Sequence, residues 1–175
     1  MKSNVTIRTL TDGGQPATDV AAAIAEFLDG ASRTLDLAQY DFDLGAETSA
    51  IVGGAIRRAA ARGVRIRLAY NVDHANPIPV PPPPSTDRAL IDALPLEAFP
   101  IAGVPDLMHH KYVVRDAESV WSGSTNWTDD SWSRQENVIA VVKSTAVAAA
   151  YARDFEQLLE TRSGAGTGSV QPEWH

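Results

Sequence analysis

The segment formed by residues 34–70 most constrains the fold, because strand, helix and strand patterns follow one another there with short connections. Apolar and polar residues alternate over 34–42, as in a strand, and an apolar stripe with helical spacing runs through 47–62. Gly63 is suited to end that helix, and a second strand pattern follows at 64–70. Two strands joined by one helix almost always form a right-handed parallel crossover. The sequence therefore predicts an α/β fold whose central sheet is mixed, largely parallel, and covered by helices on both faces.

The rest of the chain contains further regular patterns and one long interruption. Strands are also predicted at 5–10, 96–99, 108–115, 120–123 and 137–142, and helices at 18–29, 87–94 and from 145 onward. Residues 71–85 hold six prolines, so they cannot form a regular helix or a central strand. This proline-rich loop, which includes His74, is interpreted as a rigid surface arm, with the wall or lid of a site as the alternative. The Gly/Ser-rich segment 163–175 is predicted to be a flexible tail or linker, which leaves 1–162 as one catalytic domain.

Composition narrows the class of protein. The 175 residues suit one domain with its own core, and no apolar run approaches the roughly 20 residues that a membrane helix needs. The amino terminus shows no apolar signal core, so we expect a cytoplasmic location. The net charge of −7 argues mildly against a dedicated nucleic-acid binder. The five arginines within 57–67 leave local attraction to phosphates open, although a solvated helix face with ion pairs is the simpler interpretation.

A histidine and a lysine two residues apart are the main candidates for chemistry. Side chains two apart on a strand point the same way, so a strand at 108–115 would place His109 beside Lys111. Imidazole can act as a nucleophile or as an acid–base group, and this lysine is one of only three in the chain. The turn that follows supplies the hydroxyl of Ser124 and the amide of Asn126, which are groups that bind phosphate oxygens. The pattern predicts a phosphate-handling site.

The spacing of these residues resembles the HKD motif, H-x-K-x4-D-x6-G-S-x-N, of the phospholipase D superfamily. All six fixed positions of that motif are filled, by His109, Lys111, Asp116, Gly123, Ser124 and Asn126. The wider run as far as residue 138 is most similar to members with a single motif, namely small bacterial endonucleases and the mitochondrial cardiolipin hydrolase/Zucchini group. Outside the motif the resemblance is looser and rests on 37–42 and 62–66.

The resemblance implies an active site built from two motifs, whereas this chain carries one. It therefore implies a homodimer, or a second motif-bearing lobe. One His109 would form a phosphohistidine, while its counterpart would protonate the leaving oxygen and then activate water. Lys111 would act in catalysis and, with Ser124 and Asn126, bind the substrate phosphate. No metal and no other cofactor is implied.

The sequence supports a specific expectation for each of three further residues in or near the motif. Glu136 matches an acidic residue downstream of the motif, which the resemblance implies would orient the catalytic histidine with support from Ser124. Asp116 is included among the candidate catalytic residues because it fills a motif position, but its place past the strand end favours a role as a turn former or ion-pair partner. His110 points away from His109 and is expected in the core or in an interface.

The resemblance implies a phosphodiesterase that hydrolyses a phosphodiester bond in a phospholipid or in a nucleic acid. The acidic net charge favours lipids or small diesters, whereas the similarity to single-motif nucleases favours nucleic acid. The alternative is a non-catalytic or incomplete lobe of a two-motif enzyme, which would act as a phosphate-binding module, and a glycine-rich tail would suit its linker.

Overall fold

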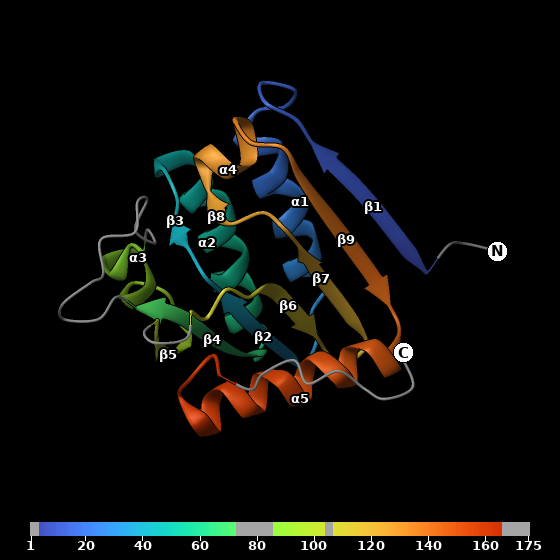
Figure 1. The fold of residues 1–175 in the computed structure, drawn as a ribbon, viewed down its shortest axis with the longest axis vertical. Helices are drawn as coiled ribbons and strands as arrows, with labels where there is room; N and C mark the ends of the chain where they lie inside the picture. Colours follow the sequence, from blue (N-terminus) through green and yellow to red (C-terminus); the bar gives the residue numbers. More distant parts are fainter. Residues whose placement is uncertain (1–3, 73–85, 104–106, 166–175) are drawn as a thin grey trace.

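The computed structural model describes residues 4–72, 86–103 and 107–165 (Figure 1). Along the chain the described elements are β1 (Val5–Leu10), α1 (Ala17–Asp29), β2 (Thr34–Gln39), β3 (Phe42–Asp43), α2 (Ala46–Ala61), β4 (Arg65–Val72), α3 (Arg88–Asp92), β5 (Glu97–Ala102), β6 (Lys111–Arg115), β7 (Ser119–Gly123), β8 (Trp127–Thr128), α4 (Asp129–Ser133), β9 (Asn137–Lys143) and α5 (Thr145–Thr161). His74 and the proline-rich loop 74–85 lie outside the described residues, as does the expected tail from residue 166 onward. The division into a domain at 1–162 and a tail therefore stays a prediction.

The main sheet is mixed, with the strand order β1-β9-β7-β6-β2-β4-β5 (Figure 1). The strands β2, β4 and β5 are parallel neighbours, and α2 lies between β2 and β4 in the chain, as the predicted crossover requires. All pairs from β2 through β6, β7 and β9 to β1 are antiparallel. The mixed α/β class is confirmed, but in the main sheet parallel pairing is confined to β2, β4 and β5, which corrects the expectation of a largely parallel sheet. The physical reason lies in the short connection between β6 and β7, which permits a hairpin and is too short for a parallel crossover.

The β6–β7 hairpin is closed by a turn in which two residues adopt left-handed backbone angles. Asp116 has φ 56° and Ala117 has φ 55°, and the backbone N–H of Glu118 donates to the carbonyl of Arg115 (3.0 Å). Two central residues with positive φ define the turn type whose twist matches that of paired strands. Aspartate tolerates this conformation better than most residues do, so the turn begins at a residue suited to it.

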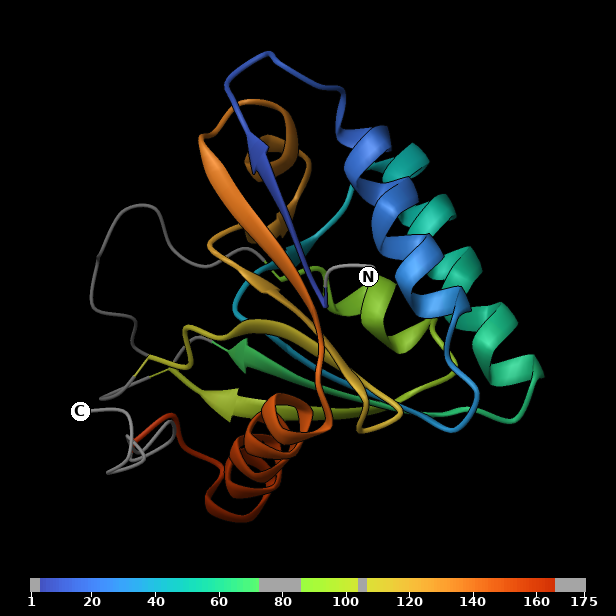
Figure 2. The same cartoon turned by 90° about the vertical axis from the view of Figure 1, so that its right-hand side faces the viewer.

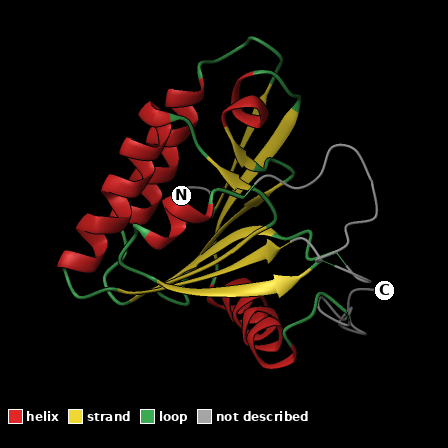
Figure 3. Ribbon diagram, turned by 90° about the vertical axis from the view of Figure 1, so that its left-hand side faces the viewer, coloured by secondary structure: helices red, strands yellow, loops and turns green. Residues whose placement is uncertain are grey.

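Helices cover both faces of the sheet, as predicted. One layer holds α1, α2 and α3, and α5 lies on the opposite face (Figures 2 and 3). Side chains of β6 alternate between the two cores: Val113 packs with the residues under α1 and α2, while Tyr112 and Val114 pack with Phe155 of α5. Within the described residues, no helix has both the length and the apolar character needed to cross a membrane.

A second, two-stranded sheet joins the segment after β2 to the segment after β7. Phe42 pairs with Trp127 and Asp43 with Thr128, in parallel. Phe42 and Trp127 are each 1% exposed, and the centroids of their rings lie 5.5 Å apart. The sequence did not predict this sheet, because two-residue strands leave no alternating pattern to detect. This small sheet holds the segment after β2 against the segment after β7, and both segments carry polar residues at the same edge of the main sheet.

Candidate active site

Three of the six predicted site residues meet where β2 and β7 end and β6 begins, namely His109, Lys111 and Asn126. Lys111 is the first residue of β6 and pairs with Gln39, the last residue of β2. Because β7 runs antiparallel to β6, Gly123 at its end lies beside the start of β6. A Cβ atom on Gly123 would collide with the backbone carbonyl of Val138, so only glycine permits this close approach of β7 to β9. Residues from β2, β6 and β7 therefore lie together at this edge of the sheet.

The strand predicted at 108–115 begins at Lys111, and residues 107–110 have no regular structure. Pairing with β2 stops at Gln39, and beyond it one backbone bond, from the N–H of Tyr40 to the carbonyl of His110 (2.8 Å), continues the register. Strand alternation therefore does not place His109 beside Lys111. Instead, Nζ of Lys111 donates to the backbone carbonyl of His109 (3.0 Å), and both side chains contact the ring of Tyr40.

Lys111 is a buried cation, with 9% of the residue exposed. Its Nζ lies 4.8 Å from the centroid of the Tyr40 ring, a cation–π contact. Burial lowers the pKa of Lys111 to about 8, and the negative charge of Asp41 opposes that effect. Near neutral pH the lysine is still charged but poorly solvated, so an anion that approaches it replaces missing solvation.

His109 has an exposed side chain whose ring packs edge-on against Tyr40, with 4.7 Å between centroids. Partial burial and the positive charges of Lys111 and His110 lower the pKa of His109 below its ordinary value of 6.5. At neutral pH the imidazole is therefore mainly uncharged, and a ring nitrogen keeps the lone pair that a nucleophile needs. Tyr40 thus contacts both His109 and Lys111 and holds them in one cluster.

Asn126 reaches the same cluster through Asp41. Its Nδ2 donates to Oδ2 of Asp41 (2.7 Å), and the backbone N–H of Trp127 donates to the carbonyl of Asp41 (3.2 Å). Oδ1 of Asn126 is buried and accepts no hydrogen bond from the described residues. Since the charge of Asp41 also acts on Lys111, the structure brings His109, Lys111 and Asn126 together around Tyr40 and Asp41.

No hydrogen bond within the described residues links Ser124 or Glu136 to the side chains of this cluster. Oγ of Ser124 donates to Oδ1 of Asn137 (2.7 Å) and accepts from the backbone N–H of Val138 (3.0 Å), which ties the turn after β7 to β9. Glu136 is exposed, and no hydrogen bond within the described residues links it to His109. Their proposed roles, in phosphate binding and in orienting the histidine, therefore stay predictions.

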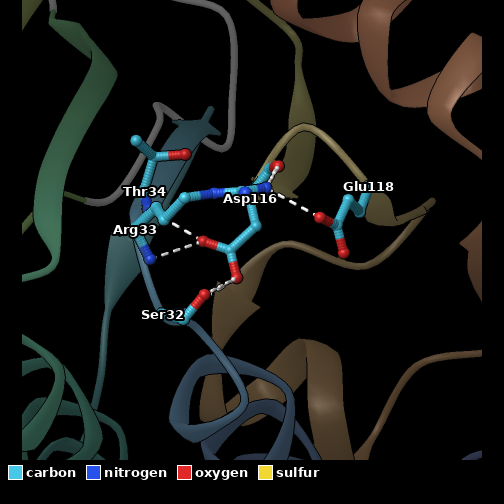
Figure 4. A network of polar contacts seen from close by, with 5 residues as sticks. All are labelled: Ser32, Arg33, Thr34, Asp116 and Glu118. Atoms are coloured by element: carbon cyan, nitrogen blue, oxygen red, sulfur yellow. Dashed lines mark hydrogen bonds and ion pairs between the residues drawn. The ribbon is translucent and has the colours of Figure 1, made fainter.

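Asp116 lies at the other end of β6, five residues from Lys111, or roughly 17 Å at the rise of a strand. Its carboxylate accepts hydrogen bonds from the backbone N–H groups of Ser32 (2.9 Å), Arg33 (2.7 Å) and Thr34 (2.9 Å) and from the hydroxyl of Ser32 (3.0 Å) (Figure 4). Burial alone would raise the pKa of Asp116, but these bonds outweigh it and hold the pKa below its ordinary value. Asp116 therefore does not join the cluster, and its contacts are those of an anchor between the hairpin turn and the start of β2.

His110 lies in a polar cluster under α5. Its Nε2 is 3.4 Å from Oδ2 of Asp154, and the same oxygen accepts a hydrogen bond from the hydroxyl of Tyr112 (2.7 Å). Burial and the nearby Asp154 raise the pKa of Tyr112 well above its ordinary value. The expectation that His110 is a core histidine turned away from His109 agrees with these contacts.

Tyr40 and Asp41 are the residues of the cluster that the sequence motif does not contain. Both follow β2, more than sixty positions before the motif. Their signal in the sequence was weak: the segment 37–42 belongs to the looser part of the resemblance, and polar residues beyond a strand end often line sites in α/β folds. Only the pairing of β2 with β6 shows which side chains they meet.

Fold and site together define an α/β protein with a histidine–lysine cluster at one sheet edge. The chain belongs to the phospholipase D superfamily: the family described as "Cardiolipin synthase, PLD-like domain" matches residues 24–159. It is also similar to the mitochondrial cardiolipin hydrolase of Xenopus laevis, with 38% identity over 53 residues, which are 30% of this chain and 25% of that relative.

Two solved structures share the fold at low sequence identity. NucT from Helicobacter pylori superposes with a TM-score of 0.66 at 15% identity, over 89% of this chain and 96% of that chain. Nuc from Salmonella typhimurium, a phospholipase D family member, superposes with a TM-score of 0.64 at 16% identity, over 90% of this chain and 95% of that chain. The expected phospholipase D-like fold is thereby confirmed.

Proposed function

We propose that the chain is a phosphodiesterase that cleaves a phosphodiester bond of a phospholipid or a nucleic acid through a phosphohistidine on His109. The observation that carries the proposal is the convergence of His109, Lys111 and Asn126 around Tyr40 and Asp41. Membership of the phospholipase D superfamily supports the reaction class, and the name of the Xenopus laevis relative makes a phospholipid a substrate to test first.

The chemistry follows from the states of these groups. A neutral His109 attacks phosphorus, so that an N–P bond forms while the bond to the leaving oxygen breaks. A second imidazole, in its protonated form, gives its proton to the leaving oxygen, then takes one from the water that cleaves the N–P bond. The ammonium of Lys111 and the amide of Asn126 stabilise the charge on the oxygens that stay bound to phosphorus.

The second imidazole would come from a second copy of the chain, since this sequence contains one motif. A sheet face next to the site supports a dimer: Val5, Ile7 and Val138 are 45%, 67% and 46% exposed, and the register of β1 on β9 puts all three on one face. Val138 also holds Ser124 in the turn after β7. Exposed apolar surface of this kind marks interaction sites, and a second copy bound over it would lie close to the edge that bears His109.

The dimer can be tested by placing a charge on this face. Ile7→Lys should give a monomer with little activity, because the second histidine is then missing. Thr6→Lys is the matched control, since Thr6 is exposed on the same strand but pairs with Val141 on the opposite face. Mass in solution and turnover would be measured together. A fully active monomer would rule out the shared site, and a wild-type monomer without activity would favour the alternative of an incomplete, phosphate-binding lobe.

The reaction itself can be tested with a panel of phosphatidylcholine, cardiolipin, DNA, RNA and bis-p-nitrophenyl phosphate in excess EDTA. We propose that no metal is needed, because histidine and lysine supply the nucleophile and the charge. Turnover of at least one diester in EDTA, lost in His109→Ala, is the expected result. Activity that EDTA abolishes and a divalent ion restores would contradict the phosphohistidine mechanism.

A further inference from the structure

A carboxylate lies among the groups that the proposed function assigns to phosphate binding. Asp41 is 8% exposed, and its Oδ2 accepts the hydrogen bond from Nδ2 of Asn126 (2.7 Å). The same carboxylate acts electrostatically on Lys111. Asp41 thus faces both the amide donor and the cation, and its charge offsets that of the lysine within the cluster.

The position of Asp41 is fixed by its backbone neighbours. Its carbonyl accepts the N–H of Trp127 (3.2 Å), and the next residue, Phe42, pairs with Trp127 in the small sheet. The packed rings of Phe42 and Trp127 hold this pairing in the core. The backbone of Asp41 therefore cannot withdraw when a ligand binds, and an anion at Asn126 and Lys111 must accept a carboxylate beside it.

We propose that Asp41 determines the charge of the ligand, so that the site favours phosphodiesters, which carry one negative charge, over phosphomonoesters and inorganic phosphate. This inference rests on the proposed function. A phosphomonoester carries between about 1.5 and 2 negative charges at pH 7. A fixed carboxylate repels each of those charges, so it disfavours a dianion about twice as strongly as a monoanion. Repulsion of the wrong ligand is a common source of specificity.

The same repulsion has a consequence for turnover. Hydrolysis adds water across the P–O bond, releases an alcohol, and leaves a monoester whose new acidic oxygen loses its proton to solvent. The product therefore carries more negative charge than the substrate. Beside Asp41 it is bound more weakly than the diester was, which favours release of the product over its retention.

Ligand binding can be measured without turnover, by ³¹P NMR titration of inorganic phosphate and of dimethyl phosphate. Asp41→Asn removes the charge but keeps an oxygen that can accept the Asn126 bond. It should tighten inorganic phosphate about tenfold or more and dimethyl phosphate distinctly less. Asp43→Asn is the matched control, since Asp43 is exposed two residues further on, and should change neither. If Asp41→Asn does not fold, Asp41→Ser supplies a smaller uncharged acceptor with the same expected result.

Three outcomes would overturn the inference: equal tightening of both ligands, no tightening of either, or the same shift in Asp43→Asn. A role limited to positioning Asn126 would leave Asp41→Asn like the wild type and weaken both ligands in Asp41→Ala. Hydrolysis of bis-p-nitrophenyl phosphate, assayed on the same samples, separates the two proposals. A wild type that does not hydrolyse it, yet shows the predicted binding shift, would count against the reaction and not against the charge selection.

Discussion

The two ends of β6 carry parts of one motif under opposite physical conditions. At the end that bears Lys111, a buried ammonium contacts a carbonyl and a ring, and burial lowers its pKa to about 8. At the other end, the Asp116 carboxylate accepts four hydrogen bonds and its pKa is held low. Within the described residues the ammonium of Lys111 makes one hydrogen bond, whereas the carboxylate of Asp116 accepts four. Motif membership alone therefore does not define a role: the saturated end anchors the hairpin turn to the start of β2, and we propose that the poorly solvated end binds the ligand.

The largest expected effect is at the end of β6 where His109 and Lys111 lie, which we call the active end. His109→Ala should abolish turnover, because loss of one acid–base group usually costs roughly 10²–10⁴-fold and His109 is also the nucleophile. His110→Ala should instead lower stability, since His110 contacts Asp154 under α5. Turnover of bis-p-nitrophenyl phosphate and urea unfolding of both variants would check this. A His109→Ala protein with a near-normal rate would mean that the reacting group lies elsewhere.

Replacing Lys111 should lower activity without lowering stability. Lys111→Met removes the charge that stabilises the phosphate and should reduce kcat by roughly 10²–10³-fold. Its stability should equal or exceed that of the wild type, because replacing a buried charge with an apolar side chain of similar size is often neutral or stabilising. The urea midpoint and the turnover would be measured on the same sample. Marked destabilisation would contradict the account of Lys111 as a cation held for function.

The opposite pattern is expected at Asp116. Asp116→Ala leaves several backbone donors unpaired, each worth roughly 1–3 kcal/mol, and puts alanine at φ 56°. The free energy of unfolding should fall by about 3 kcal/mol or more. Asp116→Asn, which keeps an acceptor and tolerates the left-handed angle, should lose distinctly less. Activity per folded molecule should be retained in both, and its loss in a well-folded Asp116→Asn protein would show that Asp116 acts in the chemistry.

Smaller effects are expected from pH. Because one His109 must be neutral and its counterpart protonated, kcat/KM should fall on both sides of the lowered pKa of His109, and loss of the Lys111 proton should add to the fall above pH 8. Stability has a different dependence: the contributions of Lys111 and Asp116 should both grow as pH rises, each in its own pH range. The pKa of Lys111 is depressed in the fold, so the wild type should gain stability relative to Lys111→Met as pH rises from 8 toward 10.5. The stability that Asp116 contributes is present above its ordinary pKa of 3.8 and is lost as pH falls through its lower folded value. If the stability of Lys111→Met or Asp116→Asn changed with pH in the same way as that of the wild type, these assignments would be contradicted.

The sequence predicts what depends on local pattern. Apolar spacing predicted the crossover from β2 to β4, and motif spacing predicted His109, Lys111 and Asn126. Pairing between distant strands has no local pattern, so the sequence could not show that Tyr40 and Asp41 are neighbours of Lys111. The distance between Asp116 and Lys111 was only partly predicted. Their spacing in the sequence gives a distance in space only when the segment between them is known to be a strand. In the antiparallel half of the sheet, the hairpin turn at 116–119 is local and was predicted, whereas the pairs of β2 with β6, β7 with β9 and β9 with β1 join more distant segments.

The central claim, that His109 is the nucleophile at the active end of β6, is tested most directly by trapping the covalent intermediate. Wild-type protein would be mixed with a ³²P-labelled diester, quenched early in base, and digested to locate the label. The account predicts a base-stable, acid-labile phosphoryl group, still bearing one ester substituent, on His109 and its absence in His109→Ala. Label on His110 or Ser124, or rapid turnover with no trapped label under conditions that stabilise N–P bonds, would contradict it.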